Sequence, residues 1–258
     1  REMLEKFTQE FFFNEDGSIK VAFHSFNKSF DFEQLLEAHL RKLIDKKAPV
    51  GASDAEQQPT WRHGSPFRGL QRFELEHAPV FFGRSGATSD VMQQLKNLAA
   101  DNRHFLLIQG MSGSGKSSLV CAGVLPLLIE PGVIEGMGLW RHAISKASDS
   151  HDLFMALAQA LTSDTALPEL LSDNMTVEKI ADALSEPKAI EATIRGALRE
   201  VGSKCQIQEK LEQVPQARLV LILDQLEEVF TRKVISQKQR QQFFAVIQGL
   251  ASSGLVWI

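Results

Sequence analysis

The sequence is poor in cysteine, which limits the chemistry that the chain can carry. Its 258 residues include two cysteines, Cys121 and Cys205, with neither the spacing of metal ligands nor the density of a disulfide scaffold. Two cysteines alone cannot build a metal cluster. Their scarcity fits a reducing compartment, so we expect the protein in the cytoplasm.

Long apolar runs are absent too. No stretch reaches the roughly 18 consecutive apolar residues that a membrane helix needs. The first residues, REMLEKFTQEFFF, lack the basic-then-apolar order of a signal peptide. We therefore expect a soluble protein with no membrane partner. Because the chain starts at Arg1 rather than Met, and residues 255–258 look like a strand that stops halfway, we expect a segment of a longer chain.

The chain also lacks an excess of charge of one sign. It has 28 basic and 32 acidic residues, a net charge of -4 and a pI near 6.0. This balance gives no global electrostatic reason to expect nucleic acid as a partner. A basic run at residues 232–240 is interleaved with Gln rather than with aromatic residues, which argues against a stacking platform for single strands.

The remaining composition, 43% hydrophobic and 23% charged residues, is that of an ordinary globular domain. Residues 1–47 predict a helix, a short strand or hairpin, and a second helix, which is too little for an independent core. Residues 48–65 are polar, contain Pro, Gly and Ser and show no period, which is typical of an interdomain linker. We therefore expect the main domain at residues 66–258.

Beyond the linker, short apolar runs alternate with helical patterns. Strands that are apolar throughout and separated by helices are typical of a parallel sheet with both faces covered, so the sequence predicts the α/β class. The predicted strands are residues 105–108, 139–144, 219–223 and 255–258, and the predicted helices are a segment ending near Leu128, the stripe at residues 153–161 and residues 176–211.

A glycine-rich motif follows the first of these strands. Residues 110–117, GMSGSGKS, match the pattern G-x-x-x-x-G-K-[ST] between a strand and a helix. Gly110, Gly113 and Gly115 permit backbone angles and a close approach that a Cβ would block, so successive amides and the helix dipole can face one anion. The alternative is an accidental Gly-Ser turn. The predicted phosphate-binding residues are Gly110, Ser112, Gly113, Ser114, Gly115, Lys116, Ser117 and Ser118.

The motif predicts ATP and Mg²⁺ as ligands. Lys116 would reach the β- and γ-phosphates, and the Ser117 hydroxyl would ligate Mg²⁺. Asp224 ends the apolar run 219–223, so we predict it as the second Mg²⁺ ligand. Glu227, by preference, or Glu228 would orient and deprotonate the attacking water. Alternatively, these two acids complement the dipole at a helix N-terminus.

Four blocks of the sequence follow one another in a distinctive order. They are PFRGL at residues 66–70 with Phe73, Glu76 and Ala78, then FFGR at 81–84, GMSGSGKSSLVCAGVLP at 110–126 and LVLILDQLEEVF at 219–230. In this order they resemble the STAND-type signal-transduction ATPases and, within them, the prokaryotic clade with an aromatic Gly-Arg motif before the loop. The resemblance covers residues 61–258. It implies an AAA-like P-loop core, here incomplete at its C-terminus, between an N-terminal effector and C-terminal sensor repeats.

The resemblance carries further expectations for residues and partners. It places Phe82, Gly83 and Arg84 beside the adenine and ribose, although Phe81 and Phe82 suit a core equally well. Ser85 stands where many members have Glu, which leaves the local pocket contacts open. Residues 1–47 are similar to the end of a TIR-like α/β effector domain. The expected partners are ATP and ADP, further copies of the chain on activation, and an unknown trigger such as a phage protein.

We therefore expect a slowly hydrolysing, Mg²⁺-dependent ATP switch in bacterial anti-phage or stress signalling. Two alternatives remain at this stage. One is a scaffold that ATP stabilises without significant hydrolysis. The other is a nucleic-acid motor or kinase built on the same loop, since a fold does not fix a function.

Overall fold

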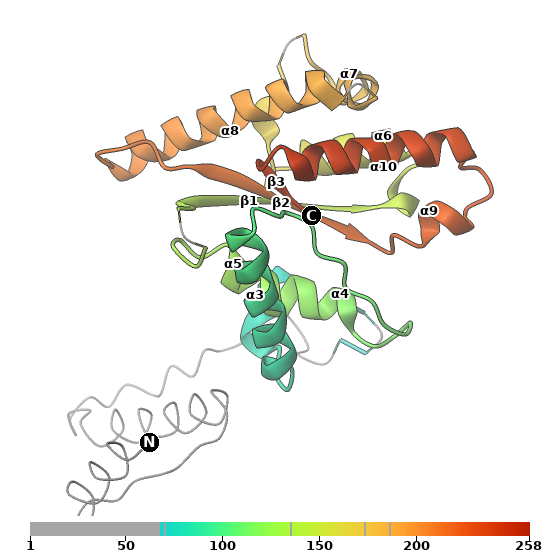
Figure 1. Ribbon diagram of the computed structural model, residues 1–258, viewed down its shortest axis with the longest axis horizontal. Coiled ribbons are helices and arrows are strands. Elements are labelled where there is room, and N and C mark those ends of the chain that lie inside the picture. The colour runs from blue at the N-terminus through green and yellow to red at the C-terminus, as the bar shows by residue number, and fades with distance from the viewer. Residues whose placement is uncertain (1–67, 70, 135, 173, 186) are drawn as a thin grey trace, which may run out of the picture. The chain divides into compact units, whose positions relative to one another are not determined.

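The computed structural model describes residues 68–258 apart from Leu70, Glu135, Asp173 and Glu186 (Figure 1). These residues belong to one compact unit, Trp61–Ile258. The predictions for residues 1–47 and for the linker at 48–65 lie outside the described residues. Within the described part, no helix has both the length and the apolar character needed to span a bilayer.

The centre of the unit is a parallel sheet. Its strands are β1 (Leu139–Lys146), β2 (Ala217–Asp224) and β3 (Val256–Trp257), which lie in the order β1-β2-β3. Leu139 pairs with Ala217 at one end of β1, and Lys146 pairs with Asp224 at the other, so both strands end at the same edge of the sheet. The predicted α/β class with a parallel sheet is therefore confirmed.

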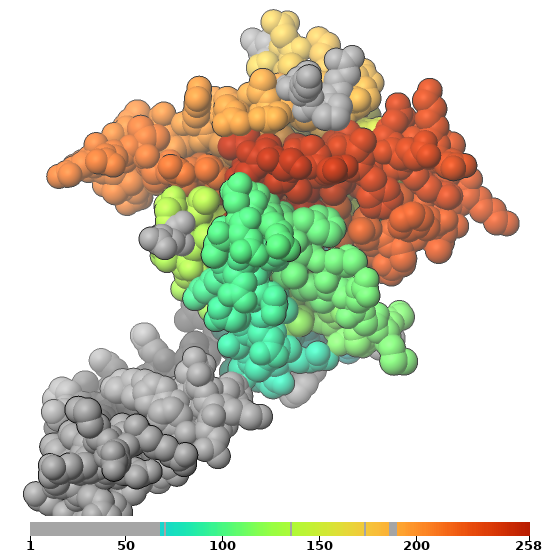
Figure 2. Space-filling view, in the orientation of Figure 1, coloured from blue at the N-terminus to red at the C-terminus, as the bar shows by residue number. Residues whose placement is uncertain are grey.

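Helices cover both faces of the sheet (Figure 1). Helices α8 and α10 lie side by side over one face, as the space-filling view shows (Figure 2). On this face lie α6 (Leu153–Leu161), α7 (Val177–Leu184), α8 (Pro187–Glu209) and α10 (Gln237–Ser252). On the other lie α3 (Ser85–Ala100) and a helical run made of α4 (Lys116–Ser118), η2 (Leu119–Val124) and α5 (Leu125–Leu128). Shorter turns are η1 (Leu75–Val80), η3 (Ala147–Asp149), η4 (Pro168–Leu170) and α9 (Glu228–Thr231).

Two cores follow from this layering. Leu219 and Leu221 of β2 join the core under α6, α7, α8 and α10, whereas Val220 joins the core under α3. In the second core the rings of Trp140 and Trp257 meet edge to face, with centroids 5.4 Å apart. Because both faces of β2 are buried, its residues 219–223 are continuously apolar rather than alternating. This is the pattern from which the strand was predicted.

The strand predicted at residues 105–108 is not a regular strand. Residues 104–109, here called the pre-loop segment, run beside the end of β3: Leu106 N–H donates to Ile258 O at 2.7 Å, and Ile258 N–H donates to His104 O at 2.8 Å. Within the described residues, the pre-loop segment has no further backbone partner after Leu106. With only these two backbone hydrogen bonds, the segment lacks the continuous series of bonds that would make it a β-strand.

The helix predicted at residues 176–211 is two helices, α7 and α8. Pro187 opens α8, and a proline cannot continue a helix that precedes it because it lacks an N–H group. The helix that ends at Leu128 is present, but it is π-helical from Leu119 to Val124. Helices α3 and α10 were not among the predicted elements.

Candidate functional site

The glycine-rich loop, residues 110–117, forms an open cradle of backbone amides. Gly113 and Gly115 have φ angles of 75° and 79°, a region that favours glycine. In the described part of the chain, the N–H groups that donate to no acceptor include those of Gly113, Gly115, Lys116 and Ser117. Unpaired amides gathered on one short loop are suited to an anion.

The Lys116 side chain folds back over this loop. Its Nζ donates to Gly110 O at 2.8 Å and to Met111 O at 2.9 Å. The ammonium group therefore lies at the loop, bound only to carbonyl groups that are weaker partners than a phosphate. Such bonds can be exchanged for bonds to phosphate oxygens.

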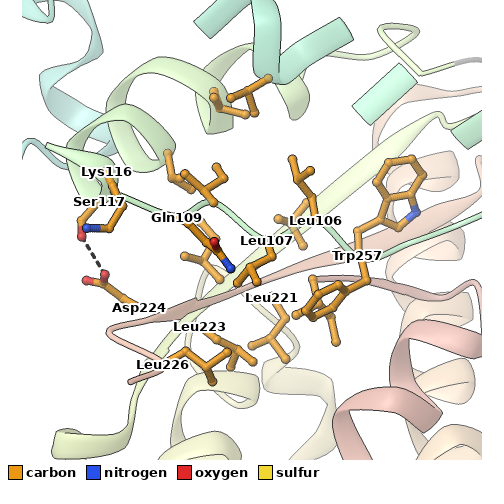
Figure 3. Close-up of a pocket in the computed structure, with 18 of the residues that line it drawn as sticks. Leu106, Leu107, Gln109, Lys116, Ser117, Leu221, Leu223, Asp224, Leu226 and Trp257 are labelled. Carbon is orange, nitrogen blue, oxygen red and sulfur yellow. Dashed lines mark hydrogen bonds between the residues drawn. The ribbon is translucent and has the colours of Figure 1, made fainter. Parts of the chain in front are cut away.

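Two oxygen-bearing side chains meet where β2 ends. Ser117 Oγ donates to Asp224 Oδ1 at 2.6 Å, and the Asp224 side chain is 10% exposed (Figure 3). Two cations face the other oxygen, Oδ2: Arg72 Nη1 at 2.7 Å and Lys146 Nζ at 3.7 Å. The site thus brings together the two residues predicted to bind a metal ion.

A sharp turn follows Asp224. Gln225 has a φ of 56°, in the left-handed region that non-glycine residues seldom adopt. The turn leads to Glu227, which is exposed and lines the same cavity as Lys116 and Asp224. Glu228 opens α9, is half-buried and does not line this cavity. The two predicted acids therefore differ in position, and Glu227 is the one beside the loop.

The cavity, of about 650 Å³, lies between the pre-loop segment and β2 (Figure 3). Its polar end is formed by Lys116, Ser117, Asp224 and Glu227. The rest of the lining is mainly apolar, and Phe105 and Leu107 of the pre-loop segment are 42% and 52% exposed. The carboxylates of the lining and Lys116 therefore lie together beside the loop, and the lining also includes Arg103 and His104.

The aromatic Gly-Arg residues have different surroundings. Arg84 Nη2 donates to Ser114 O at 2.6 Å, so its guanidinium covers the glycine-rich loop. Gly83 has a φ of 82°, and Phe82 is 82% exposed. The core alternative for Phe82 is therefore wrong. Phe81 packs against Phe73, with ring centroids 5.5 Å apart.

The Ser118 hydroxyl links the loop helix to the segment before η1. Its Oγ accepts a hydrogen bond from Phe73 N–H at 3.0 Å, which ties residues 72–74 to the helix that follows the loop. Phosphate binding by the backbone amide of Ser118 stays a prediction.

Comparison with protein families gives the match that decides the assignment. The model of the family Novel STAND NTPase 1 matches residues 66–258. The chain belongs to this family. Comparisons with curated proteins and with solved structures found no match. The resemblance to STAND NTPases is thereby confirmed, whereas a TIR-like preceding domain and an anti-phage role stay predictions.

Membership in the Novel STAND NTPase 1 family implies a nucleotide and usually Mg²⁺, and the site residues fit both. Ser117 Oγ and Asp224 Oδ1 are the oxygen donors that Mg²⁺ prefers. Among the described residues, no group of three or more His, Cys, Asp or Glu side chains is placed to hold a metal ion. A cation at Ser117 and Asp224 therefore needs water and phosphate oxygens as its other ligands, which is the usual arrangement for Mg²⁺.

Two residues of the site in this STAND NTPase were missed by sequence reasoning, Arg72 and Lys146. The parallel register of β1 and β2 places Lys146 beside Asp224, so the end of the predicted strand at 139–144 pointed toward it. No sequence signal indicated Arg72, which lies 152 positions from Asp224. Burial lowers the pKa of Arg72, but the hydrogen bond to Glu74 and the charges of Glu74 and Asp224 outweigh it, so the pKa is raised.

Proposed function

We propose that this STAND NTPase is an ATP-binding and hydrolysing switch that uses Mg²⁺. One observation carries the proposal: Ser117 Oγ and Asp224 Oδ1 lie 2.6 Å apart, beside a loop with free backbone amides. A cradle for a polyphosphate and an oxygen pair for a divalent cation are thus adjacent. Both are needed for phosphoryl transfer.

In this proposal the loop amides from Gly113 to Ser118 bind the β- and γ-phosphates, and Lys116 exchanges its two carbonyl partners for phosphate oxygens. Ser117 and Asp224 would hold Mg²⁺, which would supply positive charge to offset the negative charge that develops on the phosphate oxygens.

The hydrolytic step needs a base for the attacking water, and we assign this role to Glu227. Its carboxylate takes a proton as the water oxygen bonds to the γ-phosphorus, the bond to the β,γ-bridging oxygen breaks, and ADP and phosphate leave. Its place on the cavity lining beside Lys116 supports this choice over Glu228.

The adenine and ribose are assigned to the side of the loop where Arg84 lies. Its bond to Ser114 O supports this place, and the exposed ring of Phe82 is free to stack on a base. Gly83 supplies the φ that turns the chain between them.

We further propose that nucleotide state controls self-association of the chain and activation of an effector, in cytoplasmic anti-phage or stress signalling. The trigger would be a foreign molecule such as a phage protein. Support for this part comes from family membership and from the resemblance of the four sequence blocks.

ATP turnover with variants of the two acids tests the hydrolytic role. Glu227→Gln is expected to lower turnover at least about a hundredfold, since general-base catalysis typically contributes that much. Nucleotide affinity should be retained, because the variant keeps size and removes only the proton acceptor. Glu228→Gln is the matched control, with turnover within about threefold of the wild type.

The alternatives give different results. Loss of turnover in Glu228→Gln alone would transfer the base role to that residue. Binding without measurable turnover in the wild type, unaffected by either variant, would favour the ATP-stabilised scaffold. Turnover stimulated by DNA, or a phosphorylated product, would favour a motor or a kinase.

A further inference from the structure

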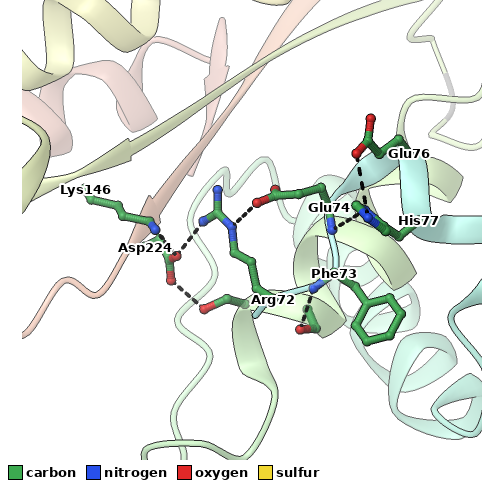
Figure 4. A network of polar contacts seen from close by, with 9 residues as sticks. Arg72, Phe73, Glu74, Glu76, His77, Lys146 and Asp224 are labelled. Atoms are coloured by element: carbon green, nitrogen blue, oxygen red, sulfur yellow. Dashed lines mark hydrogen bonds and ion pairs between the residues drawn. The ribbon is translucent and has the colours of Figure 1, made fainter. Parts of the chain in front are cut away.

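The Asp224 carboxylate is bound by cations of the chain itself. Arg72 Nη1 lies 2.7 Å from Oδ2, and Lys146 Nζ lies 3.7 Å from the same atom (Figure 4). Ser117 donates to the other oxygen at 2.6 Å. A side chain that the proposed function assigns to Mg²⁺ is therefore already neutralised by a guanidinium.

The guanidinium of Arg72 has a second carboxylate within reach. Its Nε donates to Glu74 Oε1 at 2.6 Å while Nη1 is bound to Asp224. The Arg72 side chain is 23% exposed and that of Glu74 is 36% exposed, so the Glu74 end is the more open to water. Glu74 can therefore keep the guanidinium paired if the contact with Asp224 is lost.

The backbone around Arg72 is fixed in place. Phe73 N–H donates to Ser118 Oγ at 3.0 Å, and Glu74 N–H donates to His77 Nδ1 at 3.1 Å. The Phe73 ring packs against the rings of His77 and Phe81, and His77 is fully buried. Exchange of Arg72 between two partners is thus a side-chain movement that leaves its backbone anchored to the loop helix.

A guanidinium and a divalent cation bound to one carboxylate repel each other, even where they bind different oxygens. Arginine remains protonated in proteins, so its charge is removed only by moving the side chain. Ser117 contacts Oδ1 and Arg72 Nη1 contacts Oδ2, so a cation held by Ser117 and Asp224 would share this carboxylate with the guanidinium. The repulsion is larger in a partly buried site than in water.

We propose that Arg72 acts as an internal cation that competes with Mg²⁺ for Asp224, so that metal binding moves the guanidinium onto Glu74 alone. This inference rests on the proposed function, because it takes Ser117 and Asp224 as the Mg²⁺ site. Without metal, Arg72 keeps the carboxylate neutralised and in position. With metal, the guanidinium gives up Asp224 and keeps Glu74 as its partner.

Binding of a fluorescent ATP analogue, mant-ATP, tests this competition. The quantity to compare is the Kd in EDTA divided by the Kd in excess Mg²⁺, measured with the whole chain. Arg72→Gln should raise this ratio about fivefold or more, because Mg²⁺ no longer displaces a cation and metal-free Asp224 then repels the phosphates. Arg72→Lys keeps the charge and should stay near the wild type. Arg195→Gln removes an arginine from an ion pair on α8 and is the matched control.

The possible outcomes separate this inference from the proposed function. A ratio that is unchanged or lower in Arg72→Gln overturns the competition, and a purely structural role would change both Kd values together. Asp224→Asn should bring the ratio close to one if that carboxylate holds Mg²⁺. Absence of mant-ATP binding by the folded wild type would overturn the proposed function and the inference with it. Melting curves with and without Mg²⁺ give a second measurement if metal-free Arg72→Gln is less stable.

Discussion

At the scale of single residues, burial alters the chemistry of Cys121 beside the site. Cys121 is fully buried in η2, and burial raises the pKa of its thiol to about 11. The positive charge of Arg72 lowers this pKa but does not outweigh the effect of burial. The folded protein therefore holds the thiol proton more tightly than the unfolded chain. Because the pKa is higher in the folded protein than in the unfolded chain, the thiol's contribution to the free energy of unfolding is complete below pH 9. This contribution is lost as the pH rises toward 11.

We predict that Cys121→Ala reduces the alkaline loss of stability. Between pH 8.5 and 11 the wild type should lose about 1–3 kcal/mol more free energy of unfolding than the variant, since one pKa unit corresponds to about 1.4 kcal/mol. The sequence contains no tyrosine that could titrate in this range. Urea denaturation at both pH values measures the difference, with Cys205→Ala of α8 as control. Equal losses in the wild type and Cys121→Ala would contradict the prediction.

The residues of the site divide into those that local sequence reveals and those that it does not. Lys116 and Ser117 are given by the spacing of one motif, and Asp224 by the end of an apolar strand. Arg72 becomes part of the site only through a contact over 152 positions, which no local pattern encodes. The exposure of Phe82 was equally hidden, because an aromatic pair in sequence suits either a core or a surface.

At the scale of elements, the tightest packing beside the site is at Gly123 of η2. A Cβ on Gly123 would lie 2.7 Å from Thr88 Oγ1 and 3.0 Å from Phe81 Cε1. Gly196 of α8 is a matched helical glycine with no atom within 4 Å of its added Cβ. Helix α3, which carries Thr88, therefore depends on glycine at position 123 for its close approach to the loop helix.

We predict opposite effects of alanine at these two glycines. Gly123→Ala should destabilise the protein by about 1–3 kcal/mol, because overpacking forces Thr88 or Phe81 to shift. Gly196→Ala should stabilise it by about 0.5–1 kcal/mol through reduced backbone freedom in the unfolded chain. Chemical denaturation measures both. A stabilising effect at both positions would show that the contact of η2 with α3 is looser than described.

Helices and strands were predicted correctly from the sequence where the apolar residues of the buried face recur at a regular spacing. β1, β2 and α6 lie at the predicted places, since their apolar residues are continuous or recur at helical spacing. Helix α10 was missed because its first turns, QKQRQQ from residue 237, are polar. Helix α3 was missed for a similar reason, since its only buried residues are Thr88, Met92 and Leu95.

At the scale of the whole unit, the order of strands decides which residues meet. β3 lies beside β2, and the pre-loop segment lies beside the end of β3, so the loop reaches Asp224 from across β3. The class of a parallel α/β sheet follows from the alternation of strand and helix patterns. The strand order does not, because it depends on pairing between segments that are not neighbours in the sequence, such as Leu139 with Ala217 and Leu219 with Val256.

The central claim is that the glycine-rich loop binds ATP with Mg²⁺, and calorimetric titration of ATP tests it most directly. The wild type should bind ATP in a Mg²⁺-dependent manner. Lys116→Ala should weaken binding at least about tenfold, since a charge-assisted hydrogen bond contributes about 1.5–3 kcal/mol. Lys96→Ala, which removes an exposed lysine from α3, should bind like the wild type. Equal affinity in the wild type and Lys116→Ala, or no binding by the folded wild type, would contradict the account.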